Sequence, residues 1–280
     1  MSKGKKPQIL LTNDDGIRSD GLWAAAEALS EVGFVTVAAP RDQHSGMGRS
    51  MPFDSDGKLG KQEVTIHGVT WTVYAIGGSP AQTVQHGVLE LTEERPDLVV
   101  SGINRGENLT VDITISGTVG AALEGAAFGI PSMAVSLEMP KDHQWPEDGK
   151  KQDASADYTA AAYYTAHFAQ ILLEGKSFSD VDVLKIDVPS DATKDTPWRL
   201  TRLSRLQYYV PLKPEREHPE QEVNLDFEIR FDENELEPDS DVYAVRVARE
   251  VSVTPLSLDM TSRADFGEIE SQYREYDSRI

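Results

Sequence analysis

Short apolar runs alternate with segments of helical length through most of the chain, and this alternation constrains the fold more than any other feature. We predict strands at residues 8–12, 34–39, 97–101, 132–137 and 181–188. Helical patterns fill the intervals at residues 20–32, 79–91, 117–128 and 153–173. Strands that alternate with helices form a parallel sheet covered on both faces. The sequence therefore predicts an α/β fold with a doubly wound, mostly parallel sheet.

Two features interrupt this alternation. Residues 41–61 are polar and contain several glycines, which indicates a long loop. Residues 63–67 and 70–76 then alternate in polarity around His67-Gly68, as the two strands of a β-hairpin do. Ser79 follows and is expected to cap the helix that runs to about Leu91.

The pattern changes beyond Trp198. Residues 199–209, 222–231 and 242–254 have β-type patterns, and a polar helix is expected at 262–276. We therefore predict two parts, a Rossmann-like core at residues 1–189 and a β-rich C-terminal extension at residues 190–280.

Prolines and acidic stretches interrupt the extension too often for an independent core. An isolated hairpin is marginally stable in water, and packing against a second chain would supply apolar contacts and cover the strand edges. We expect the strands of the extension to pair outside the core, against a second chain. The chain should therefore form at least a homodimer, with a homotetramer as the larger alternative. Residues 222–253 and the C-terminal helix would contribute to the interface.

The charge balance narrows the choice of partners. The chain has 47 acidic and 27 basic residues, a formal net charge of -20, which disfavours long nucleic acids. A small anionic substrate would need a metal ion or backbone N–H groups to offset this charge. The absence of cysteine excludes disulfides, thiolate metal sites and cysteine nucleophiles. Residues 1–7 are polar, and no stretch could span a bilayer, so we expect a soluble cytoplasmic protein without membrane contacts.

Acidic residues follow the first predicted strand. Ligands of open α/β sheets bind beyond the carboxyl ends of the strands, where Asn13, Asp14 and Asp15 are expected. Adjacent carboxylates repel each other unless a cation lies beside them, and oxygen ligands suit Mg²⁺, Mn²⁺ or Ca²⁺. The alternative is an ordinary Asp-Asp-Gly turn that caps the next helix. The residues by themselves leave both interpretations open.

Later loops are expected at the same crevice. Asn104 and Asn108 follow the strand at 97–101, and Ser116-Gly117-Thr118 begins a helix whose backbone N–H groups could bind an anion. These motifs could equally be an Asn/Gly turn and a helix cap. Weaker candidates are a loop histidine and three arginines that could steer phosphate, namely His44, Arg41, Arg49 and Arg105. The sequence has no P-loop, dinucleotide-binding fingerprint or serine-hydrolase elbow.

Five motifs together closely resemble the survival protein E (SurE) family. They are LLTNDDGI at residues 10–17, APRDQHS at 39–45, GGSPA at 77–81, VSGINRGEN at 100–108 and SGTVGAALEG at 116–125. The likeness continues to VSVTPL at 251–256, so it covers most of the chain. The resemblance implies a Rossmann-like core and a metal-dependent nucleotidase. Such enzymes release phosphate from nucleoside 5′- and 3′-monophosphates, and some members also trim short polyphosphate.

The resemblance also implies site residues and assembly. The metal-binding positions of the family match Asp14, Asp15, Ser45 and Asn104, which implies one divalent cation, Mg²⁺ or Mn²⁺, with Ca²⁺ as an alternative in crystals. The phosphate-contacting positions match Asn108, Ser116, Gly117 and Thr118. The C-terminal extension would serve in dimer or tetramer assembly. The chain departs from the family in having Arg249-Glu250 where a Gly-Tyr pair is usual, and in a polar insertion at residues 138–151.

A phosphate monoester needs its charge offset and an attacking water held in line. We assign Asp14 and Asn13 as catalytic residues, with Asp14 orienting or deprotonating the water, although either carboxylate could serve. Two rival functions are a receiver-like signalling domain, with Lys185 near the acidic pair, and a nucleotide-binding module without turnover. A receiver domain needs a phosphoacceptor Asp at the end of a central strand, where this chain has SGIN at residues 101–104. Metal-dependent phosphate release would distinguish an enzyme from a binding module.

Overall fold

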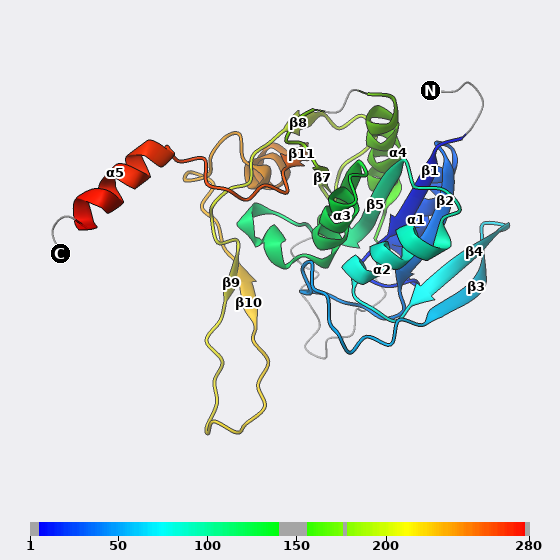
Figure 1. Ribbon diagram of the computed structural model, residues 1–280, viewed down its shortest axis with the longest axis horizontal. Coiled ribbons are helices and arrows are strands. Elements are labelled where there is room, and N and C mark those ends of the chain that lie inside the picture. Colours follow the sequence, from blue (N-terminus) through cyan, green and yellow to red (C-terminus); the bar gives the residue numbers. More distant parts are fainter. Residues whose placement is uncertain (1–5, 140–155, 176–177, 278–280) are drawn as a thin grey trace.

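A nine-stranded sheet forms the centre of the protein in the computed structural model, which describes residues 6–139, 156–175 and 178–277 (Figure 1). The strand order is β3-β4-β2-β1-β5-β6-β7-β11-β8, and the six strands from β4 to β7 run parallel. The nine strands are β1 (Gln8–Thr12), β2 (Phe34–Pro40), β3 (Leu59–Ile66), β4 (Val69–Ile76), β5 (Leu98–Arg105), β6 (Ser132–Leu137), β7 (Val183–Val188), β8 (Trp198–Leu200) and β11 (Val251–Leu256). The predicted α/β class with a mostly parallel sheet is confirmed.

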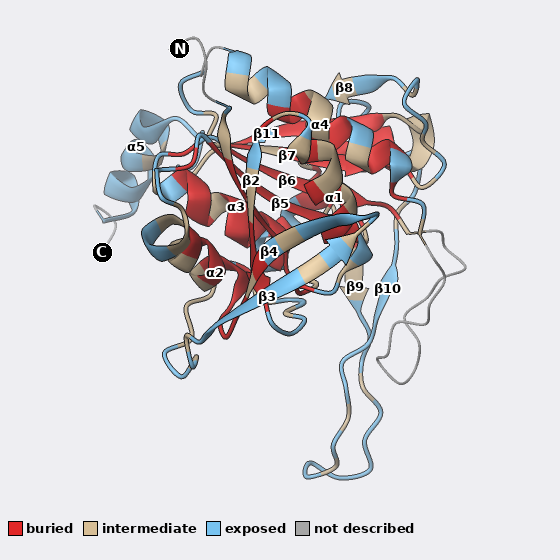
Figure 2. Ribbon diagram, turned by 90° about the vertical axis from the view of Figure 1, so that its right-hand side faces the viewer, coloured by how far each residue is buried: buried red, intermediate tan, exposed pale blue. Residues whose placement is uncertain are grey.

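Helices cover both faces of the sheet. α1 (Asp20–Ser30) and α4 (Thr159–Glu174) pack on one face, and α2 (Pro80–His86) and α3 (Gly117–Ala127) pack on the other. Because the inner strands are buried on both faces, they are apolar along most of their length. Figure 2 shows this buried sheet between exposed outer helix faces, with β3 exposed at the edge.

The order of the strands defines where a ligand can bind. From β1 the chain adds β2 and β4 on one side and β5, β6 and β7 on the other. The direction of winding therefore reverses between β1 and β5, and Thr12 pairs there with Ser101. Ligands of doubly wound sheets bind beyond the carboxyl ends of the strands at such a reversal.

Most local predictions in the core are confirmed. β3 and β4 form the predicted antiparallel hairpin, and the hydroxyl oxygen of Ser79 accepts a hydrogen bond from the backbone N–H of Gln82 at 3.1 Å, which caps α2. The helix predicted to reach Leu91 changes to a π-helical turn, η1 (Gly87–Leu91). The strand predicted at 97–101 is longer in the structure, because β5 continues to Arg105, and a 3₁₀ helix, η2 (Thr110–Ile115), follows before α3.

The extension differs most from the prediction. Residues 242–254 were expected to be β-type throughout, yet they contain a π-helical turn, η3 (Tyr243–Ala248). The physical reason is that Val242 and Val245, three positions apart, pack at helical spacing against Leu109 and Tyr208. The expected strands at 199–209 and 222–231 are also shorter, with β9 (Tyr209–Pro211) and β10 (Phe227–Ile229) forming a small antiparallel pair.

Two strands of the extension complete the sheet of their own chain. β11 pairs antiparallel with β7, and β8 pairs with β11, so the expectation that the strands pair outside the core is wrong for these two. The β9–β10 hairpin and α5 (Phe266–Asp277) instead project from the body of the molecule, and α5 has no buried residue (Figures 1 and 2). The boundary between residues 189 and 190 stays a prediction.

Two expectations concern residues outside the described ranges. Most of the polar insertion at 138–151 lies there. The first residues of the helix predicted at 153–173 lie there as well, and the described part of that helix is α4. Within the ranges that are described, no helix is both long and apolar enough to cross a membrane.

Candidate active site

The turn after β1 presents the two adjacent carboxylates at the carboxyl end of the sheet. The side-chain amide of Asn13 closes this turn, because its Nδ2 donates to the carbonyl of Gly16 at 3.0 Å and its Oδ1 accepts from the N–H of Gly16 at 3.1 Å. Gly16 has a φ of 93°, which favours glycine. Both ends of the Asn13 amide thus hold the turn that carries Asp14 and Asp15. The catalytic role assigned to Asn13 stays a prediction.

Asp14 lies against the start of α3. Its side chain is almost fully buried, and the hydroxyl of Thr118 donates to its Oδ1 at 2.5 Å. A Cβ atom on Gly117 would lie 2.7 Å from the Cβ of Asp14 and 3.1 Å from the carbonyl oxygen of His44. Only glycine allows the helix to approach this closely. The structure thus brings together the first acidic residue and two residues predicted to bind phosphate.

Asp15 links the two other loops of the site. Its Oδ2 accepts a hydrogen bond from the backbone N–H of Arg105 at 3.0 Å, directly after Asn104. The Nε2 of Gln43 lies 3.3 Å from the Oδ1 of Asp15 and donates to the hydroxyl of Ser45 at 2.9 Å. The four residues predicted to bind metal therefore come from the turn after β1, the loop after β2 and the end of β5, which meet at one end of the sheet.

Asn104 and Asn108 lie beside the same residue of β6. Asn104 pairs with Ser136 in the β5–β6 ladder, and the side-chain amide of Asn108 donates to the hydroxyl of Ser136 at 2.8 Å. The Nδ2 of Asn104 donates to the carbonyl of Gly106 at 2.8 Å, so the amide oxygen is the atom that can face a cation. Both amides are thus oriented by neighbouring groups.

Ser116 has a structural role that the sequence left open. Its hydroxyl accepts a hydrogen bond from the N–H of Val119 at 3.1 Å and caps α3. Because the first turn of a helix has N–H groups without acceptors inside the helix, an anion can bind at this end. The predicted phosphate contacts of Ser116, Gly117 and Thr118 would therefore use backbone N–H groups more than the Ser116 hydroxyl.

The weaker candidates have other partners. Arg41 lies 3.2 Å from a carboxylate oxygen of Asp42, and Arg49 lies 2.7 Å from one of Glu124. These ion pairs reduce the charge that either arginine could offer a phosphate. Burial lowers the pKa of His44 below its usual value, which favours a neutral imidazole at pH 7.

A group of buried charges near Asn108 was not predicted from the sequence. Lys185 and Asp187 lie on β7 with no exposed surface, and the Nζ of Lys185 is 2.5 Å from Asp187 and 3.2 Å from Asp241. Lys185, the lysine that a receiver-like site would use, pairs in the structure with these two carboxylates. The signal was present in the sequence, because charged residues within an otherwise apolar, buried strand require partners.

The chemistry of the donors fits a hard divalent cation. In the described part of the chain, no group of three or more His, Asp or Glu side chains could hold a metal ion. The candidate set is therefore mixed, with carboxylates from Asp14 and Asp15, a hydroxyl from Ser45 and an amide oxygen from Asn104. Oxygen donors of this kind, completed by water, suit Mg²⁺ or Mn²⁺.

Comparisons with known proteins find relatives that match most of this chain. Residues 9–210 match the family described as Survival protein SurE. A 5′-nucleotidase SurE from Thermococcus gammatolerans is 41% identical over 267 residues, covering 94% of this chain and 95% of the relative. One from Methanosarcina mazei is 38% identical and covers 96% and 99%. The crystal structure of a SurE protein from Aquifex aeolicus superimposes with a TM-score of 0.72 at 30% identity, covering 95% of this chain and 100% of that one.

Proposed function

The chain belongs to the survival protein SurE family, and we propose that it is a metal-dependent phosphomonoesterase that hydrolyses nucleoside monophosphates. Its relatives, named 5′-nucleotidase SurE, identify it as a nucleotidase. The alternatives of a receiver-like domain and of a module without turnover are therefore set aside. The observation that supports the metal-dependent mechanism is the contact of Asp14, which directly precedes Asp15, with the first turn of α3.

Asp14, Asp15, Ser45 and Asn104 would hold one divalent cation. When bound, the cation would act as a Lewis acid toward the phosphoryl oxygens and offset their charge. The two carboxylates supply the negative charge that retains it, and the hydroxyl and amide complete the protein's share of the ligands.

The other residues bind and orient the substrate. The N–H groups at Gly117 and Thr118 would donate to phosphoryl oxygens, and Asn108 would add a contact from the opposite loop. Asp14 would orient the attacking water and accept its proton. Because these residues would contact a terminal phosphoryl group and not a base, we extend the proposal to 3′-monophosphates and short polyphosphate.

Removal of divalent cations should abolish activity. We expect the purified protein to release phosphate from AMP or GMP with Mg²⁺ or Mn²⁺, to stop when EDTA is added, and to recover when excess cation is restored, because Asp14 and Asp15 repel each other without it. Colorimetric phosphate release measures this. Equal activity before and after EDTA would contradict the metal-dependent mechanism.

We also propose a homo-oligomer, dimer or tetramer, and a cytoplasmic location. Apolar side chains are exposed on the projecting parts of the extension, including Leu225 and Phe227 near the hairpin and Phe266 and Tyr273 on α5. Burying them against a second chain would remove apolar surface from water. Light scattering of the full chain should give at least twice the mass of one chain, and removal of residues 259–280 should reduce it if α5 contributes. A monomeric full-length protein would contradict the proposal.

A further inference from the structure

The loop at residues 106–110 carries Asn108, and its position is set from both ends by the C-terminal extension. The loop runs from the end of β5 to Thr110, the first residue of η2, and begins two residues after Asn104. A displacement of about 1 Å can cost an enzyme up to a hundredfold in rate, so the groups that hold such a loop matter as much as the residue that it carries.

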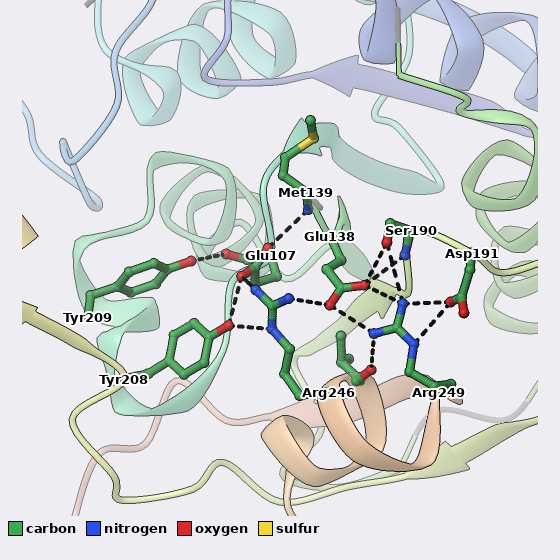
Figure 3. Close-up of polar contacts among 10 residues, drawn as sticks. Glu107, Glu138, Met139, Ser190, Asp191, Tyr208, Tyr209, Arg246 and Arg249 are labelled. Carbon is green, nitrogen blue, oxygen red and sulfur yellow. Dashed lines mark hydrogen bonds and ion pairs between the residues drawn. The ribbon is translucent and has the colours of Figure 1, made fainter. Parts of the chain in front are cut away.

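Arg246 holds the loop before Asn108. Figure 3 shows its guanidinium between two carboxylates: Nη2 pairs with Glu107, and Nη1 is 2.5 Å from the Oε1 of Glu138. The Nε of Arg246 donates to the hydroxyl of Tyr208 at 2.5 Å, and that hydroxyl donates to Glu107 at 2.9 Å. The side chains of Arg246 and Glu107 are only 4% and 3% exposed, so water can replace few of these contacts.

Asp241 holds the loop after Asn108. Its Oδ2 accepts from the backbone N–H of Thr110 at 2.9 Å and also lies beside the ammonium of Lys185. Thr110 has a φ of 61°, in the left-handed region that β-branched residues rarely adopt, and this hydrogen bond helps to hold it there. Lys185 in turn donates to the carbonyl of Asn108 at 2.7 Å, and a carboxylate oxygen of Asp187 accepts from the backbone N–H of Asn108 at 2.7 Å.

Asp241 and Arg246 lie within one short segment of the extension. Asp241 is the first of the two helical residues that lead into η3, and Arg246 is part of η3. The buried charges are costly unless every partner is in place, so the network favours a single arrangement of the loop. A phosphate site on the core thus depends on a segment more than 100 residues later in the chain, since the Arg246–Glu107 contact spans 139 residues.

We propose that Arg246 and Asp241 are positioning residues for the phosphate site, which they act on through the 106–110 loop and Asn108. This inference rests on the proposed function, in which Asn108 contacts the phosphoryl group. It assigns to the C-terminal extension a part in substrate binding that is separate from any part in assembly.

The test compares Arg246→Met with Arg249→Met. Arg249 follows η3 directly, and its side chain also binds Glu138, but its other side-chain hydrogen bonds among the described residues go to Asp191, Ser190 and Val245. Binding of inorganic phosphate to the Mg²⁺-loaded full-length protein is measured by calorimetry, and KM and kcat for AMP are measured alongside. We expect Arg246→Met to weaken phosphate binding and raise KM roughly tenfold, with Arg249→Met near the wild type.

Further variants separate positioning from general destabilisation. Arg246→Lys keeps the charge but cannot bridge two carboxylates and a hydroxyl, so it should restore only part of the phosphate affinity. If Arg246→Met fails to fold, Glu107→Gln, which keeps the size of the side chain but removes its charge, should show the same weakening in phosphate affinity. An inactive wild type would refute the proposed function. Because calorimetry does not depend on turnover, the comparison of phosphate affinities would still test the positioning role of Arg246. Wild-type phosphate affinity in Arg246→Met or Glu107→Gln, or equal losses in Arg246→Met and Arg249→Met, would overturn it.

Discussion

Replacement of Asp15 by Asn should lower phosphate release from AMP by at least about a hundredfold, a loss at the upper end of that seen when groups supporting a metal site are removed. The loss is expected because Asp15 would supply one of the two negative charges that hold the cation. An asparagine can still accept the N–H of Arg105 through its amide oxygen, so the local hydrogen bond can persist. Stability should be unchanged or higher, because one charge of a repulsive pair is removed.

Three further variants make this prediction specific. Asp14→Asn should lose most activity as well, while Ser45→Ala should be milder because a hydroxyl is a weaker ligand than a carboxylate. Asp54→Asn removes the same charge from an exposed position in the loop after β2 and should keep wild-type activity. Thermal unfolding and initial rates are measured on the same preparations. If Asp15→Asn unfolds the protein while its folded fraction stays fully active, the Asp-Asp-Gly sequence is only a turn.

Replacement of Lys185 by Met should destabilise the protein by about 3–5 kcal/mol, the range found when one partner of a buried ion pair is removed. Methionine fills a similar volume, but it leaves Asp187 and Asp241 without their shared ammonium. It also removes the donor to the carbonyl of Asn108. Urea unfolding of the variant and the wild type measures the difference. Lys58→Met, at a 78% exposed lysine 3.9 Å from Asp56, is the control and should change stability little.

The loss in Lys185→Met should depend on pH. In the wild type, burial raises the pKa of Asp187 to about 6, while Lys185 opposes this shift. Burial also acts to lower the pKa of Lys185, but its two carboxylate neighbours outweigh burial and raise it, so the lysine stays charged. Without the ammonium, the pKa of Asp187 should rise further.

The sign of this dependence follows from proton binding. A carboxyl group whose pKa is higher in the folded than in the unfolded state binds protons preferentially in the folded state, so its penalty is largest at high pH and is relieved as pH falls through the folded pKa. The stability deficit of Lys185→Met should therefore be larger at pH 8 than at pH 5.5. A deficit below 1 kcal/mol at both values would show that the two carboxylates do not need the ammonium.

Local patterns in the sequence determined most of the core. The apolar runs, the hairpin at β3 and β4 and the Ser79 cap depend on residues close together in the chain, where periodicity and capping chemistry act directly. The position of Asp14 and Asp15 at the end of a strand likewise depends on residues close together in the chain. From these features the sequence by itself determined the α/β class and placed the candidate site residues in loops that a parallel sheet brings to one edge.

Contacts across long separations in the chain were decided only by the tertiary structure. The hydrogen bond from Thr118 to Asp14 spans 104 residues, and the antiparallel pairing of β11 with β7 joins the extension to the core. No local pattern specifies such partners, because they depend on which surfaces remain to be buried after the sheet has formed. For the same reason, the sequence of residues 242–248 has a β-type pattern, whereas packing against Leu109 and Tyr208 makes these residues helical and places Arg246 beside Glu107.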